Sequence, residues 1–131
     1  MKNNTFKVCV AAALLTVFLM SSMPGEQVIS KEGNATVVNT KTIGQDIKGY
    51  AGPTPVKIYI EKNEVTKIEV LPHQEGPKYM ARAKKLLENY EGKTVSKAKK
   101  LKVDAVTGAT FTSDALIRNV KKGLEYYEKN K

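Results

Sequence analysis

The stretch PVKIYIEKNEVTKIEVLPH, residues 55–73, decides the fold because apolar and polar side chains alternate along it in two runs. The apolar positions of these runs are Val56, Ile58, Ile60, Ile68 and Val70. Alternation with a period of two is typical of a strand with one buried face and one wet face. Two such runs joined by the polar turn EKNE predict a β-hairpin, and Pro72 is expected to end the second strand because proline cannot donate to the ladder.

Two later segments change to helical spacing. In residues 77–92, PKYMARAKKLLENYEG, apolar residues recur every three or four positions, lysines fill the other face, and Gly92 is the expected stop. A final helix is expected from Ser113 to about Lys129. The residues expected in the core are Tyr79, Leu86, Leu87, Leu116, Val120 and Leu124. The sum is a small α+β domain, an antiparallel sheet with helices packed on one face.

The N-terminal part of the chain differs from the rest. Residues 1–30 combine a basic start, a short apolar run and a polar exit, which is typical of a secretory signal peptide or a retained membrane anchor. Residues 31–48 are interpreted as a linker or opening strand, with one β-like run at residues 36–39, and residues 49–131 as the domain. We therefore expect an extracytoplasmic protein, in the periplasm or at the cell surface. It would be soluble after signal cleavage or anchored to the cytoplasmic membrane.

Charge and rare residues narrow the function classes. The formal net charge is +9, and 20 of the 22 basic residues are scattered lysines, whereas nucleic-acid readers use arginine forks and exposed aromatics. We therefore expect no nucleic-acid partner, while attraction to an anionic membrane surface or an acidic redox partner stays open. The lysines of residues 97–102 are expected on a solvated face. Cys9 is the single cysteine and His73 the single histidine, which disfavours thiol chemistry and a histidine-based metal site.

The stretch VDAVTGATFTSDAL, residues 103–116, places four hydroxyl residues around one glycine. The segment KVDAV, residues 102–106, is expected to form a short strand, TGAT a turn, and Thr112 or Ser113 the cap of the last helix. A glycine turn that leads into a helix presents unpaired N–H groups and the positive end of the helix dipole, which suits a phosphate. No Walker lysine follows the glycine, and no serine–histidine pair is visible. The residues alone therefore fit either a capped turn or a phosphate site.

The sequence DAVTGATFTS resembles the flavinylation motif of the FMN-binding domain family. This family occurs in flavin subunits of ion-translocating membrane oxidoreductases and in exported electron carriers. The matching residues are Asp104, Thr107, Gly108, Ala109, Thr110 and Thr112. The stretch from Gly49 to Tyr79 is similar to the opening of the same domain, so the resemblance covers about residues 49–127. Many members have Glu-Thr-Pro-Gly where this chain has QEGPKY, a departure in the expected flavin-facing loop.

The resemblance implies that Thr110 carries FMN through a phosphoester. A separate Mg²⁺-dependent FAD:protein FMN transferase would deliver the FMN from FAD. The residues Thr107, Gly108 and Ala109 would shape the turn, and Asp104 would orient the segment or help to place the metal. The expected flavin pocket consists of Tyr50, Gly52, Pro53, Glu75, Gly76 and Pro77. For Tyr50, a place in the core stays an equal alternative.

The implied function is that of an exported electron carrier rather than an autonomous enzyme. Its flavin would exchange electrons with a membrane or extracytoplasmic redox partner, and the N-terminal segment would allow membrane association. Two alternatives stay open. One is a module of the same fold that holds flavin non-covalently or serves as a structural accessory. The other is an unrelated exported basic protein that binds an anionic surface.

Overall fold

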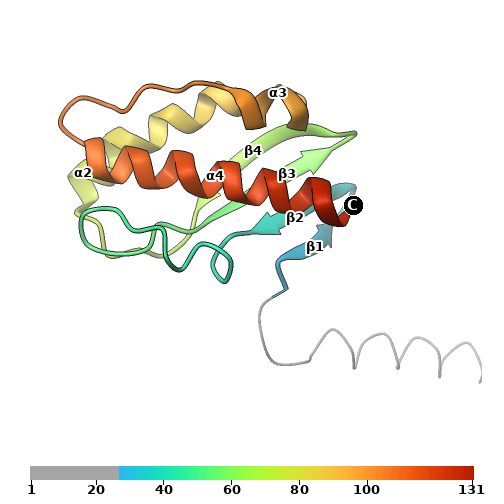
Figure 1. The fold of residues 1–131 in the computed structure, drawn as a ribbon, viewed down its shortest axis with the longest axis horizontal. Coiled ribbons are helices and arrows are strands. Elements are labelled where there is room, and N and C mark those ends of the chain that lie inside the picture. Colours follow the sequence, from blue (N-terminus) through green and yellow to red (C-terminus); the bar gives the residue numbers. More distant parts are fainter. Residues whose placement is uncertain (1–26) are drawn as a thin grey trace, which may run out of the picture.

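A four-stranded antiparallel sheet forms the base of the domain in the computed structural model, which describes residues 27–131. The strands lie in chain order across the sheet and are β1 (Ile29–Glu32), β2 (Ala35–Asn39), β3 (Val56–Glu61) and β4 (Glu64–Val70) (Figure 1). The helices are α2 (Pro77–Ala83), the 3₁₀ helix η1 (Lys84–Tyr90), α3 (Val95–Lys100) and α4 (Thr110–Asn130). The predicted α+β class is confirmed. The expected signal peptide or anchor lies almost wholly outside the described residues.

The predicted hairpin is the pair β3–β4. Lys62 and Asn63 form its two-residue turn with φ values of 51° and 65°, the left-handed backbone that matches the twist of the flanking strands. The apolar side chains of β3 are buried against the helices, as the alternation predicts. Residues 102–106 do not form the strand expected there. Leu101, Val103 and Val106 pack against the core instead, so the apolar residues of this segment are explained by packing without a strand partner.

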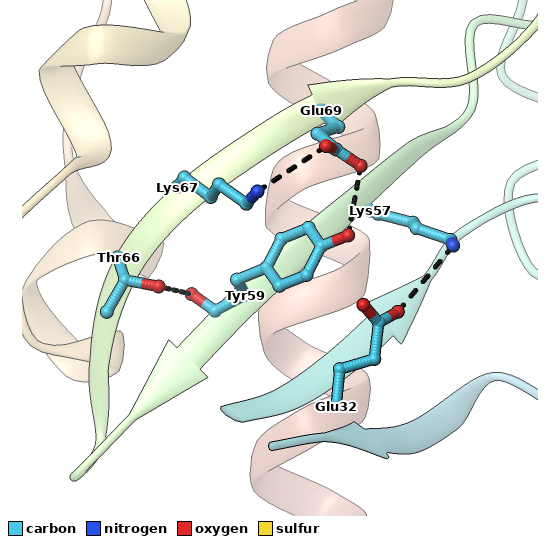
Figure 2. Close-up of polar contacts among 6 residues, drawn as sticks. All are labelled: Glu32, Lys57, Tyr59, Thr66, Lys67 and Glu69. Atoms are coloured by element: carbon cyan, nitrogen blue, oxygen red, sulfur yellow. Dashed lines mark hydrogen bonds and ion pairs between the residues drawn. The ribbon is translucent and has the colours of Figure 1, made fainter. Parts of the chain in front are cut away.

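The outer face of the sheet carries a polar cover over Tyr59 (Figure 2). The Tyr59 hydroxyl donates to Glu69 at 2.9 Å, and the Lys67 ammonium lies 4.4 Å from the centroid of the ring. Ala35 and Val37 complete a small apolar cluster beneath these groups. Burial, together with the Glu69 carboxylate, raises the pKa of Tyr59 to about 12. Cross-strand pairs therefore close this face of the sheet.

Helix α4 crosses the inner face of the sheet at close range (Figure 1). At Gly123, an added Cβ would lie 2.6 Å from Ile58 Cδ1 and 2.9 Å from Thr40 Cγ2, so glycine permits this approach. The predicted core residues that are buried are Leu86, Leu87, Leu116, Val120 and Leu124. The prediction is wrong for Tyr79, which is 51% exposed although it follows the helical spacing.

The boundaries of the helices differ from the predicted ones. The segment 77–92 divides into α2 and η1 and ends at Gly92, whose φ is 81°. Helix α4 begins three residues before the expected start at Ser113. Within the described residues, no helix is both long enough and apolar enough to span a membrane.

Candidate functional site

The motif turn lies at the start of α4 and leaves Thr110 exposed. Gly108 turns the chain with a φ of 85°, and the Ala109 N–H donates to the Val106 carbonyl at 2.9 Å. Ala109 is buried, whereas Thr110, the first residue of α4, faces solvent. The hydroxyl predicted to accept FMN is therefore accessible at a helix N-terminus.

The prediction that Thr112 or Ser113 caps α4 is wrong. The N-cap residue is Ala109 and no side chain caps the helix. Because the helix begins at Thr110, both hydroxyl residues already lie within its first turn. The Ser113 hydroxyl accepts from the Val106 N–H at 3.0 Å, and Thr112 is directed to another segment. The first N–H groups of α4 have no intrahelical acceptor, so the positive end of the helix is open to an anion.

A buried carboxylate joins this helix to the loop at residues 50–52. The Glu75 Oε1 atom accepts from the Tyr50 N–H at 2.8 Å and from the Thr112 hydroxyl at 2.7 Å. Its Oε2 atom accepts from the Ala51 N–H at 2.6 Å and the Gly52 N–H at 3.1 Å. Burial alone would raise the pKa of Glu75, but the hydrogen bonds from Thr112 and the three amides hold that pKa below its usual value. Glu75 therefore fixes the loop against α4 as an ionised group.

Three exposed aromatic rings gather around the motif turn. Tyr50 is 82% exposed, Phe111 67% and Tyr79 51%, and within residues 27–131 they are the large hydrophobic side chains that solvent reaches most. All three line one hollow of about 310 Å³, together with residues 108–110 and 112. The ring centroids of Tyr50 and Phe111 are 6.3 Å apart. Exposed apolar groups that gather in one place mark a binding surface, so this hollow is the candidate site.

The structure brings some of the predicted site residues together and separates others. Those that line the hollow are Tyr50, Gly108, Ala109, Thr110 and Thr112. Those that do not line it are Gly52, Pro53, Glu75, Gly76, Pro77, Asp104 and Thr107. Pro53 instead lines a hollow beside His73, and Asp104 lines one beside Lys102. Tyr50 is not a core residue. Glu75 contributes to the hollow indirectly, by holding the loop that carries Tyr50.

Two of the three rings were not predicted from the sequence. Phe111 stands inside the motif and could have been noticed as an aromatic residue at a helix start, whereas Tyr79 was hidden by its core-like spacing. Among the described residues, no three histidine, cysteine, aspartate or glutamate side chains gather into a possible metal site.

The region that contains the hollow matches a known protein family. The family model of the FMN-binding domain matches residues 49–125, more than half of the chain. The matched span begins one residue before Tyr50, includes Glu75 and the motif turn, and ends within α4. No curated protein matches the chain.

Proposed function

The chain belongs to the FMN-binding domain family, and we propose that it carries FMN covalently on Thr110 and relays electrons outside the cytoplasm. One observation carries the proposal: Thr110 is an exposed motif hydroxyl at the edge of a hollow that three exposed aromatic rings surround. Membership of the family indicates flavin binding. The geometry of the hollow favours Thr110 over the other hydroxyls as the point of attachment.

The other hydroxyls of the motif are less suitable. Thr112 is only 2% exposed, and its hydroxyl proton is already donated to Glu75. Ser113 is fully buried and accepts from the backbone of Val106. Thr107 is exposed but does not line the hollow. A hydroxyl that must meet both a transferase and a flavin nucleotide has to be exposed beside the hollow, which favours Thr110.

The site has parts that suit both ends of FMN. Aromatic faces and edges favour contact with a flat conjugated ring, so Tyr50, Tyr79 and Phe111 would hold the isoalloxazine. The uncapped start of α4 favours a negative charge, so a phosphate on Thr110 would lie at the favourable end of the helix dipole. When bound, FMN supplies redox chemistry, since a flavin accepts an electron pair and passes electrons singly.

Attachment would be a phosphoryl transfer in which FAD is the second reactant. The Thr110 oxygen forms a bond to the phosphorus on the FMN side of the FAD pyrophosphate. The bond from that phosphorus to the oxygen of AMP breaks, and AMP leaves. The hydroxyl proton passes to a base of the separate Mg²⁺-dependent transferase. No atom changes oxidation state, and the product is a phosphodiester with one negative charge.

The biological role follows from a small domain that would hold its cofactor at the surface. The hollow is open beside exposed rings, which suits electron exchange with a second protein rather than turnover of a substrate held inside. The apolar N-terminal run favours export, so the redox partner would be a membrane or extracytoplasmic protein. The site would then serve an electron carrier.

A gel experiment tests the covalent bond. The full chain is co-expressed with an FAD:protein FMN transferase, denatured and run on a gel, and the protein band is expected to fluoresce. Thr110→Ser should keep the label because it keeps the hydroxyl. Thr110→Val should lose it, since valine has a similar shape without the oxygen. A fluorescent Thr110→Val band would show that the acceptor is another residue. A dark wild-type band with flavin bound to the native protein would support the non-covalent alternative.

A further inference from the structure

We propose that Arg82 binds the phosphate of the flavin nucleotide at Thr110, both while FMN is transferred and after it is attached. The inference rests on the proposed function and assigns a role to a residue outside both sequence blocks that resemble the family. In this proposal the aromatic rings bind the flavin and the guanidinium binds the phosphate.

The position of Arg82 next to the motif turn carries the inference. A Cβ added to Gly108 would lie 3.1 Å from Arg82 Nη1, so the guanidinium rests against the backbone of the turn. Thr110 follows two residues later, and its Cα lies within about 7.6 Å of the Gly108 Cα because consecutive Cα atoms are about 3.8 Å apart. A phosphate on the Thr110 oxygen is therefore within reach of a flexible arginine side chain.

One face of α2 approaches the hollow. Arg82 follows Tyr79 by three positions, so the two side chains lie on the same face of α2. Tyr79 lines the hollow, and Arg82 reaches the turn that forms the edge of the same hollow. One helix face would thus present an apolar ring to the flavin and a cation to the phosphate.

Arg82 also supplies a positive charge beside the turn. Arg82 is exposed and forms no ion pair within residues 27–131, whereas the other arginine, Arg118, pairs with Asp114 at 3.6 Å. The chain uses lysine at 20 of its 22 basic positions, yet an arginine stands here. The planar fork of arginine matches two phosphate oxygens, which the single ammonium of lysine cannot do. The role of Arg82 would be to bind and orient the phosphate.

Nuclear magnetic resonance can observe this contact directly because the chain has only two arginines. In the ¹⁵N-labelled protein, the two side-chain Nε–H signals are assigned with the variants Arg82→Lys and Arg118→Lys. Spectra are recorded before and after incubation with FAD, Mg²⁺ and the transferase. We expect the Arg82 signal to shift and to exchange more slowly with water once the gel band is fluorescent. The Arg118 signal should stay in place and serves as the internal control.

A rate measurement gives an independent readout. Arg82→Gln should slow the appearance of gel-bound fluorescence by about tenfold or more, because charge-assisted hydrogen bonds to phosphate are lost. Arg118→Gln removes the same charge from an exposed site two turns along α4 and should leave the rate unchanged. Urea unfolding of both variants, with stability close to wild type, would exclude a folding defect as the cause.

The outcomes separate the two proposals. A fluorescent band with an unmoved Arg82 signal, or an Arg82→Gln rate equal to that of wild type, would overturn the role of Arg82 and leave covalent attachment intact. A dark wild-type band would overturn the proposed attachment, and the role of Arg82 with it.

Discussion

Replacing Glu75 by glutamine is expected to destabilise the domain by about 2 kcal/mol, because an amide cannot accept at both ends. The carboxylate receives two hydrogen bonds on each oxygen, from Tyr50 and Thr112 on one and from Ala51 and Gly52 on the other. The least costly arrangement turns the NH₂ group toward Thr112, whose hydroxyl can rotate and accept. The Tyr50 N–H then faces a donor.

The magnitude follows from these four contacts. One amide left facing a donor costs about 1–3 kcal/mol, and the two amide bonds that remain lose charge assistance, at about 0.5–1 kcal/mol each. The lower cost of burying an amide offsets part of this sum, since Glu75 is only 4% exposed. A net loss of about 2 kcal/mol corresponds to a fall in Tm of about 8–16 °C for a domain of this size.

The assay is urea unfolding followed by circular dichroism at several pH values. The folded-state pKa of Glu75 lies below its usual value, so its stabilising contribution is complete above about pH 4.5 and is lost as the pH falls through the folded pKa. The difference in free energy of unfolding between wild type and Glu75→Gln should therefore be constant near neutral pH and become smaller in acid. Glu88→Gln, which changes an exposed carboxylate on η1, should alter stability by less than about 0.5 kcal/mol. A Glu75→Gln variant as stable as wild type, or a difference that does not become smaller in acid, would refute the reasoning.

Three further predictions concern the core and the hollow. Gly123→Ala should destabilise by about 1–2 kcal/mol in thermal unfolding, since the contacts with Ile58 and Thr40 outweigh the roughly 1 kcal/mol gained in helix propensity; a more stable variant would contradict the close packing. Burial raises the pKa of Tyr90 to about 12, so the contribution of Tyr90 to stability is complete below about pH 10 and is lost between pH 10 and 12. Tyr90→Phe should lose less stability than wild type over this range, with the remaining loss coming from Tyr59, and equal losses in both proteins would disprove the assignment. Phe111→Ser should leave stability within about 0.5 kcal/mol because the ring is exposed, but weaken the visible circular dichroism of attached flavin; an unchanged flavin signal would place the flavin ring away from Phe111.

The sequence predicts the hairpin and the long last helix because most of the apolar residues that face the core there recur with one period, two along β3 and three or four along α4. β1 gives no such signal, since its four residues lie at the edge of the sheet and none is buried. The segment 102–106 shows the opposite failure, because its valines are apolar for packing on the core although the segment pairs with no strand. Tyr79 fails for a third reason. Helical spacing identifies a face of a helix, but it does not reveal that α2 directs this position to a hollow.

The sequence predicts the motif of the candidate site but not how its residues are placed around the hollow. That placement depends on contacts between residues that are distant in sequence. The link from Thr112 to Glu75 spans 37 residues, and the links from Glu75 to the loop span 23 to 25. No local pattern signals such contacts. The prediction of a cap at Thr112 was reasonable for a hydroxyl near a helix start, yet the chain uses that hydroxyl to hold a loop.

The same contact explains how the fold separates two threonines that look equivalent in sequence. An α-helix turns about 100° per residue, so Thr110 and Thr112 project about 200° apart and cannot face the same side. Glu75 fixes Thr112 toward the protein interior, and this leaves Thr110 on the outer side of the helix start. Phe111 projects between them and remains exposed on the wall of the hollow. Glu75 would therefore do more than hold the loop of Tyr50: by holding Thr112 inward, it would leave Thr110 as the hydroxyl open to the proposed attachment.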